Sequence, residues 1–164
     1  FGGSQENGRR GGTENYPGIE AMSVAWHWVN DRLPEFPQRS SWRDSFEETM
    51  LKSFPDMKIL GFDVPRLWNT STFVMPDFEN LRYVSKLDKL GFEVSTGSAC
   101  SSGLSKQSSI PLAMGFSEAE TKRLIRVSSY VDQSEEDWQA LASAFAQARE
   151  ELGRDNSHSS VISL

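Results

Sequence analysis

The chain has 164 residues and a hydrophobic content of 37%, with five Trp and ten Phe, which favours one folded domain over a disordered chain. A net charge of −6, without a basic block among aromatic residues, argues against nucleic-acid binding, and no apolar run reaches the length of a membrane span. The single cysteine excludes an internal disulfide framework and fits a reducing compartment, so we expect a cytoplasmic protein.

Residues 1–15, FGGSQENGRRGGTEN, contain five of the twelve glycines and two arginines, with no hydrophobic periodicity. This composition predicts a loop with exposed backbone N–H groups, which would either bind an anion or serve as a surface linker. The stretch has no initiator Met, and a glycine-rich loop is an unusual beginning for a domain. We therefore expect the chain to be a fragment of a longer protein.

Two helices are expected next. Pro17 suits the first turn of a helix that ends by Pro34 and Pro37, and a second helix should cover residues 40–54. His27 lies off the apolar stripe of the first helix, so we expect an exposed residue rather than a ligand or base. The apolar stripes, at helical spacing, are Ile19, Met22, Trp26, Val29 and Leu33 in the first helix and Trp42, Phe46, Met50 and Phe54 in the second.

Short strands alternate with helices in the middle of the chain. Residues 57–62 and 72–75 are predicted strands, and Asp77 should cap a helix that Gly91 closes. Residues 92–95 should form another strand. In the predicted helix between Asp77 and Gly91, the apolar positions are Phe78, Leu81, Val84 and Leu87.

A short apolar segment, 110–115, precedes a capping box, Ser117 to Glu120, which predicts a brief helix. Residues 124–131 alternate as in a strand. Arg126 lies in that strand among apolar neighbours, where it would either form a structural salt bridge or anchor a ligand carboxylate.

Ser134 should cap the last helix, and Gly153 should end it. We expect residues 153–164 to be a disordered tail, so that His158 is not a ligand, and we find no cluster of metal-ligating residues in the sequence. The predicted buried face of the helix comprises Trp138, Leu141, Phe145, Ala148 and Leu152. In total these elements predict an α+β domain with a short, mostly antiparallel sheet and helices packed on one side.

The only cysteine, Cys100, stands in the stretch STGSACSSG, residues 95–103. Small, polar and flexible residues of this kind predict a solvent-reachable loop, on which a thiol could meet a reaction partner. The alternative is that Cys100 is a small buried hydrophobic residue without chemistry.

Four motifs in this order resemble the C-terminal part of the cysteine desulfurases, which belong to the class V aminotransferase family of pyridoxal-phosphate enzymes. They are residues 2–18, GGSQENGRRGGTENYPG, similar to GGGxQERGxRxGTENxPG; residues 66–70, RLWNT, similar to R-x-P-N-T; residues 95–103, matching S-x-G-S-A-C-[ST]-S; and residues 124–128, LIRVS, matching S-I-R-[FV]-S. The resemblance runs from residue 1 to about residue 152. The serine-rich loop after Cys100 is similar to the NifS/IscS-type branch rather than the SufS-type.

The resemblance implies a fold type I pyridoxal-phosphate transferase. Residues 1–15 would end its large cofactor domain, and residues 16–152 would form its small C-terminal domain, with the cysteine loop at 95–110. It also implies conversion of L-cysteine to L-alanine, with pyridoxal phosphate as an electron sink. Cys100 would become a persulfide and pass its sulfur to an acceptor protein, such as an iron–sulfur scaffold, or into tRNA thiolation.

Two further roles follow from the resemblance. Arg126 matches the arginine that binds the substrate carboxylate. Thr13 matches the threonine that reaches the cofactor phosphate of the neighbouring subunit, which implies a homodimer with composite sites. We expect neither a metal nor a membrane segment.

The chain departs from the family pattern at Asn7, where arginine is usual, and at Trp68 and Gln107, where proline is usual. The sequence SSYV, residues 128–131, replaces S-L-G-R-[FY]. These departures bear on fine specificity and acceptor docking.

The family's Schiff-base lysine lies upstream of the matched region, and none of the six lysines here has its context. We therefore expect this chain to be inactive by itself. Two other functions stay open: a related lyase acting on selenocysteine or cystine, and a non-catalytic half that dimerises or docks the sulfur acceptor.

Overall fold

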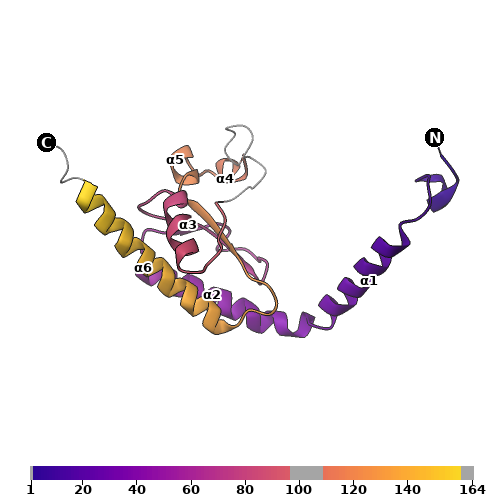
Figure 1. Ribbon diagram of the computed structural model, residues 1–164, viewed down its shortest axis with the longest axis horizontal. Coiled ribbons are helices and arrows are strands. Elements are labelled where there is room, and N and C mark those ends of the chain that lie inside the picture. Colours follow the sequence, from indigo (N-terminus) through magenta and orange to yellow (C-terminus); the bar gives the residue numbers. More distant parts are fainter. Residues whose placement is uncertain (1, 97–108, 160–164) are drawn as a thin grey trace. The chain divides into compact units, whose positions relative to one another are not determined.

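The computed structural model of the chain describes residues 2–96 and 109–159, which belong to two compact units, Phe1–Phe36 and Pro37–Leu164 (Figure 1). The sequence had placed a boundary earlier, after residue 15. The assignment of residues 1–15 to a larger cofactor domain remains a prediction.

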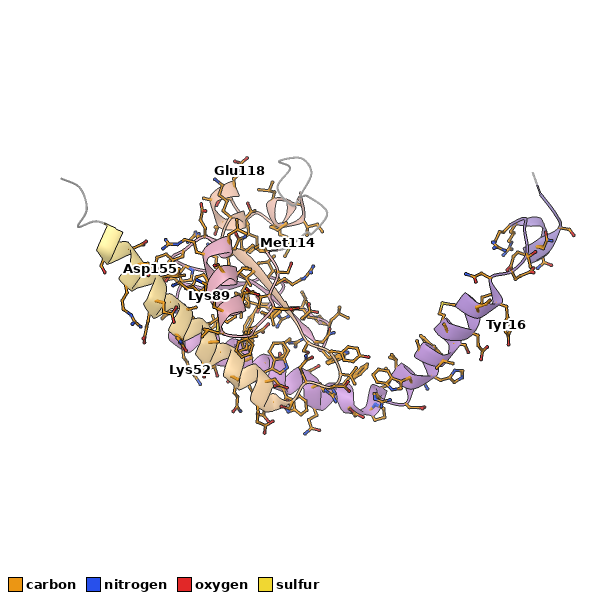
Figure 2. The ribbon with its side chains drawn as sticks, viewed as in Figure 1. Tyr16, Lys52, Lys89, Met114, Glu118 and Asp155 are labelled. Atoms are coloured by element: carbon orange, nitrogen blue, oxygen red, sulfur yellow. The ribbon has the colours of Figure 1, made fainter. Side chains whose placement is uncertain are left out.

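The first unit contains a 3-10 turn, η1 (Gln5–Gly8), the helix α1 (Tyr16–Asn30) and a second turn, η2 (Leu33–Glu35). The Asn15 side chain accepts a hydrogen bond from the Gly18 N–H at 3.3 Å, so it caps α1, and Pro17 lies in the first turn as expected. None of the residues of α1 is buried. Figure 2 shows the side chains of this helix, with Tyr16 labelled near its beginning. Of the predicted apolar stripe, Leu33 lies beyond α1, in η2, and Met22 and Trp26 are 68% and 69% exposed.

The second unit begins with the rest of α2 (Phe36–Ser53) and is built on a three-stranded antiparallel sheet in the order β1 (Lys58–Ile59), β2 (Thr70–Val74) and β3 (Leu124–Ser128). The remaining helices are α3 (Asn80–Lys89), α4 (Ser109–Ala113), α5 (Glu118–Thr121) and α6 (Glu135–Ser159).

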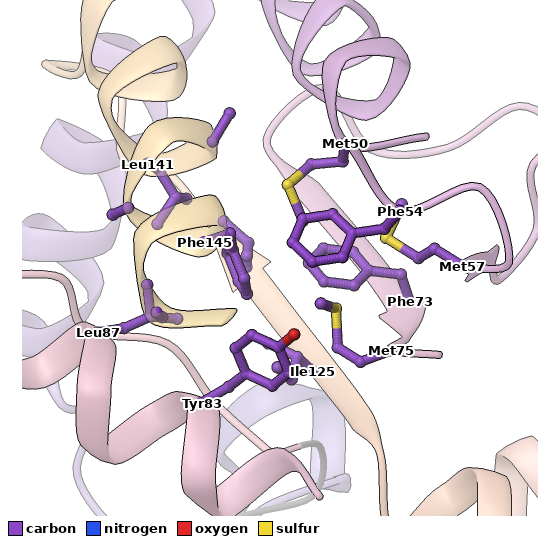
Figure 3. Packing of buried hydrophobic residues seen from close by; sticks show 14 of the residues in the cluster. Met50, Phe54, Met57, Phe73, Met75, Tyr83, Leu87, Ile125, Leu141 and Phe145 are labelled. Carbon is purple, nitrogen blue, oxygen red and sulfur yellow. The ribbon is translucent and has the colours of Figure 1, made fainter. Parts of the chain in front are cut away.

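The core lies between one face of the sheet and the helices α2, α3 and α6 (Figure 3). Phe73 and Ile125 lie opposite each other on β2 and β3 and are completely buried, since both project from the covered face. Around them pack Phe46, Met50, Phe54, Tyr83, Leu87, Trp138, Leu141, Phe145, Ala148 and Leu152. The predicted α+β class, the small antiparallel sheet and the buried face of the last helix are confirmed.

Several predicted boundaries are wrong. Residues 92–95 form no strand; only Ser95 joins the sheet, through one bridge to Arg126. Asp77 does not cap α3, which begins after Glu79, because its carboxylate instead accepts hydrogen bonds from the Phe78 N–H and the Tyr83 hydroxyl.

The predicted burial of the α3 region also needs correction. Leu81 is exposed and Tyr83 is completely buried, and the helix begins at Asn80, two residues later than a cap at Asp77 predicts. Gly91 does follow the helix, with φ +86°, a conformation that strains any residue with a Cβ.

The C-terminal helix is longer than predicted. It continues past Gly153 to Ser159, so part of the expected disordered tail is helical. Contacts with α3 support this extension, because Lys86 forms ion pairs with Glu151 at 3.3 Å and with Asp155 at 2.9 Å. Of the helices that the structure describes, none combines the length and apolar character required to cross a bilayer.

Candidate functional site at Arg126

Arg126 lies in the middle of β3, with its side chain on the face of the sheet opposite the core. Its neighbours Ile125 and Val127 are buried, at 0% and 4% exposed, while Arg126 and Ser128 are exposed. This alternation follows from the pleat of a strand, in which successive side chains point to opposite faces. The guanidinium is therefore presented to solvent by a rigid element whose other face is fixed in the core.

Arg126 pairs with Ser95 on one side, through an isolated antiparallel bridge, and with Thr72 of β2 on the other side. The Arg126 N–H donates to the Ser95 carbonyl at 2.7 Å, and the Ser95 N–H donates to the Arg126 carbonyl at 3.0 Å. Since both backbone groups of Arg126 bond to Ser95, its pairing with Thr72 is the kind without direct hydrogen bonds, in which side chains approach most closely. Thr72 therefore flanks the stem of Arg126.

The guanidinium of Arg126 forms no side-chain hydrogen bond or ion pair with residues 2–96 or 109–159. The structural salt bridge that the sequence left open is thus not formed within these ranges. A planar guanidinium on a rigid strand suits bidentate binding of a carboxylate. Hydroxyls of Thr70, Thr72 and Ser128 share this face of the sheet, because their positions pair across β2 and β3 with one another or with Arg126.

Cys100 itself lies outside the described residues. The structure does describe both ends of the segment that carries it, since Ser95 is bonded to Arg126 and α4 begins at Ser109. The two predicted site residues are therefore connected through Ser95, which is bonded to one of them and precedes the other by five positions in the sequence.

The motif at residues 66–70 lies beside this site. Asn69 joins the two long strands, because its side-chain N–H donates to the Ser129 carbonyl at 3.0 Å and its own carbonyl accepts from the Ser129 N–H at 2.8 Å. Arg66 donates two hydrogen bonds to the carboxylate of Glu47, at 2.6 and 2.7 Å, and this contact raises the pKa of the guanidinium further above its ordinary value.

Sequence reasoning missed Glu47. A signal was present, because Glu47 precedes Met50 by three residues and Phe54 by seven and so lies on the buried face of α2. A carboxylate in such a position predicts a buried partner. Its partner Arg66 comes from a quoted motif, but only the folded chain shows that the two meet.

Thr13 belongs to the first unit, and the structure places it only within that unit. It is exposed, and its carbonyl accepts a hydrogen bond from Arg10 at 3.3 Å. The loop around it brings two backbone segments close together, since a Cβ on Gly11 would lie 2.9 Å from the Gly2 Cα. The exposed hydroxyl, nearby arginines and compact glycine backbone fit an anionic group such as a phosphate.

Asn7, one of the departures from the family pattern, lies in the same loop with φ +56°, next to Glu6 at φ +54°. Asparagine tolerates this left-handed conformation better than most residues with a side chain, so its identity suits the local backbone. Within the described part of the chain, no group of His, Cys, Asp and Glu side chains is arranged to hold a metal ion.

Comparison with known proteins gives a consistent result. Residues 3–141 match the model of the family described as Aminotransferase class-V. The chain is 36% identical to cysteine desulfurase 2 of Trichormus variabilis over 115 residues, which are 70% of this chain and 29% of that protein. It is 33% identical to a cysteine desulfurase of Klebsiella pneumoniae over 139 residues, 84% of this chain and 35% of that protein.

A solved structure of a NifS-like protein from Rickettsia africae superposes with a TM-score of 0.75 at 27% identity, over 92% of this chain and 39% of that one. The chain thus spans about a third of the length of the curated relatives it matches. These matches confirm the resemblance that the four motifs predicted.

Proposed function

Because the chain belongs to the aminotransferase class-V family, we propose that it contributes the reactive thiol and the carboxylate-binding arginine of a pyridoxal-phosphate-dependent cysteine desulfurase. The observation that carries this proposal is the pair of backbone hydrogen bonds between Ser95 and Arg126. They attach the beginning of the cysteine-bearing segment directly to the residue that would bind the substrate carboxylate.

The stretch of chain between Ser95 and Cys100 is short enough to keep Cys100 near Arg126. Cys100 follows Ser95 by five positions, so the covalent chain limits the distance between their Cα atoms to about 18 Å. This limit is compatible with sulfur transfer at the Arg126 site. A sulfur carrier must receive sulfur at one place and deliver it at another, and we propose that the segment carrying Cys100 serves both steps.

In the proposed reaction, Arg126 holds the carboxylate of L-cysteine by two parallel hydrogen bonds. The thiolate of Cys100 attacks the sulfur of the substrate and forms a new S–S bond, and the C–S bond of the substrate breaks. The electron pair of that bond stays with the substrate carbon, which takes up a proton and leaves as alanine. Cys100 is left as a persulfide, whose outer sulfur passes to an acceptor protein.

The cofactor implied by the family is pyridoxal phosphate, which supplies an electron sink for the bonds that change at the substrate carbon. In this chain, Thr13 would donate a hydrogen bond to its phosphate, supported by the exposed N–H groups of the glycine-rich loop. If Thr13 serves the cofactor of a second subunit, the enzyme is a homodimer. We place the protein in the cytoplasm, where a persulfide-forming thiol stays reduced.

The test uses the complete pyridoxal-phosphate enzyme that carries this chain, with sulfide or persulfide release from L-cysteine as the measurement. Cys100→Ala should abolish sulfur release, because it removes the proposed nucleophile. Arg126→Gln should raise KM for L-cysteine by about one to two orders of magnitude, since a charge-assisted pair contributes about 1.5–3 kcal/mol. Ser143→Ala, on the exposed side of α6, is the control and should change neither parameter.

The outcomes separate the other functions. Undiminished turnover by Cys100→Ala, with cysteine, selenocysteine or cystine as substrate, would identify a lyase that needs no thiol nucleophile. If mixing this chain with a cofactor-carrying partner never produces absorbance at about 420 nm, the chain is a non-catalytic docking or dimerisation half.

A further inference from the structure

The carboxylate of Glu47 is the most completely buried charged group among the described residues, at 1% exposed, and it accepts hydrogen bonds from β2 and from the segment that precedes this strand. Arg66, four residues before the strand, donates to it twice, at 2.6 and 2.7 Å. Ser71, the second residue of the strand and itself completely buried, donates its hydroxyl hydrogen to the same carboxylate at 2.6 Å. One side chain of α2 thus contacts β2 at Ser71 and the segment before β2 at Arg66.

These bonds determine which residues of β2 face which way. Ser71 must point toward α2 to reach Glu47, so its neighbours Thr70 and Thr72 point to the opposite face. A slip of one residue would turn Thr72 into the core and Phe73 out of it. The Glu47 contacts therefore favour, together with the burial of Phe73, the register in which Thr72 lies opposite Arg126.

Stability alone does not account for this arrangement. A buried ion pair costs so much desolvation that well-packed apolar side chains often replace it without loss, whereas its specific geometry favours one arrangement over its competitors. Apolar side chains at these positions would fill the same space but would leave the burial of Phe73 and the pairing with β3 as the remaining determinants of the register.

We propose that Glu47 is a positioning residue of the carboxylate site: through Arg66 and Ser71 it holds the register of β2, and β2 in turn holds Arg126 in its binding orientation. This inference rests on the proposed function, because it assigns Arg126 to the substrate carboxylate. Glu47 touches neither the substrate nor Arg126.

The decisive variant replaces the whole polar cluster by apolar side chains, Glu47→Met with Arg66→Met and Ser71→Ala. We expect its resistance to urea to equal or exceed that of the wild type, while KM for L-cysteine rises about tenfold and kcat changes less than twofold. The conservative variant Glu47→Gln keeps an acceptor for Ser71 and should give an intermediate KM. Glu48→Gln, one residue along on the exposed side of α2, should match the wild type.

An unchanged KM in both the triple variant and Glu47→Gln would overturn the proposal and leave Glu47 a purely structural residue. If the triple variant does not fold, Glu47→Gln decides alone. A second measurement needs no activity: cross-strand NOEs between Thr72 and Arg126, and slow exchange of the Arg126 amide, should weaken in the triple variant of this chain.

The two measurements also distinguish the failure of this inference from that of the proposed function. A wild-type enzyme without sulfur release would defeat the function. Unchanged NOEs and amide exchange in a folded triple variant would then defeat the positioning role independently.

Discussion

The helices α1 and α6 carry the same kind of sequence pattern and end in opposite environments. Both have large apolar residues spaced three and four apart. In α6 the residues Trp138, Phe145 and Leu152 are almost completely buried, whereas in α1 no residue is buried and Trp26 is 69% exposed. Helical periodicity therefore identifies which face of a helix is apolar, but not which part of the molecule covers that face.

The burial of α6 has a specific cause. Phe145 lies at the centre of an aromatic cluster, with ring centroids 5.6 Å from Phe73 and 5.9 Å from Tyr83. These partners come from β2 and α3, two elements far from α6 in sequence. An isolated helix as short as α1, with 15 residues, is only marginally stable in water, since its stability depends on packing of this kind.

The largest effect should come from removing the centre of this packing. Phe145→Ala should lower the free energy of unfolding by about 3–5 kcal/mol, because it removes a fully buried ring and leaves a cavity. Chemical denaturation monitored by circular dichroism measures the change. A loss below about 1 kcal/mol would mean that α6 is not held by the core as described.

A smaller effect is expected at the beginning of α6. Ser134 accepts a hydrogen bond from the Asp137 N–H at 3.4 Å, and the Asp137 carboxylate accepts one from the Ser134 N–H at 2.7 Å. Ser134→Ala should therefore destabilise the second unit by about 1 kcal/mol. The matched variant at the cap of α1, Asn15→Ala, should leave the unfolding of the second unit unchanged, and equal losses in both variants would contradict the separation of the two units.

On α1 itself, Trp26→Ser should change the free energy of unfolding of the second unit by less than about 0.5 kcal/mol, since exposed side chains contribute little to packing. The same urea titration measures it. An acrylamide experiment provides the control, because Trp26 should be quenched much more readily than Trp138. A destabilisation as large as that of Phe145→Ala would show that α1 is packed against the core.

The smallest effect concerns α5, a helix too short for an apolar stripe, which is held by polar contacts. The Lys58 ammonium, 2.7 Å from the Glu120 carboxylate, and the Ser117 capping contacts lower the pKa of Glu120 to about 2. Because this pKa lies below the ordinary value of 4.5, the contribution of Glu120 to stability is complete above pH 4.5. It is lost as the pH falls through about 2.

An NMR titration of the Glu120 side-chain carbon measures this pKa directly. Lys58→Met should move the midpoint upward, toward the ordinary value, because it removes the largest cause of the shift. A wild-type midpoint near the ordinary value would contradict the ion pair. Glu118→Gln, in the same helix, is the control that should leave the midpoint in place.

Much of the second unit was predictable because its local signals agree with its packing. The apolar face of α6, the capping box of α5 and the glycine after α3 were all correctly predicted, since each depends on residues close together in sequence. The strand at 92–95 and the cap at Asp77 were wrong for the opposite reason. Ser95 meets only one residue of β3, and Asp77 bonds to Tyr83 and Arg149 instead of capping a helix.

In the candidate site, too, the residues were found from local motifs, whereas their contacts depend on the fold. Cys100, Arg126 and Thr13 were singled out by motifs, and these assignments remain predictions of function. The contacts that surround Arg126 were not predictable, because Ser95 and Thr72 reach it only through strand pairing. The place of Glu47 on the buried face of α2 indicates that its carboxylate needs a partner, but only the fold shows that Arg66 and Ser71 bind it.

By itself, the amino-acid sequence determined the family resemblance, the helical faces and the residue types available for sulfur chemistry, since these depend on side chains and their spacing along the chain. Tertiary structure alone decided that α6 is buried while α1 is exposed. It also decided that Ser95 and Thr72 flank Arg126 and that Glu47 binds Ser71 of the neighbouring strand. The physical reason is that burial and strand register are set by contacts between distant segments, whose free energy no local pattern contains.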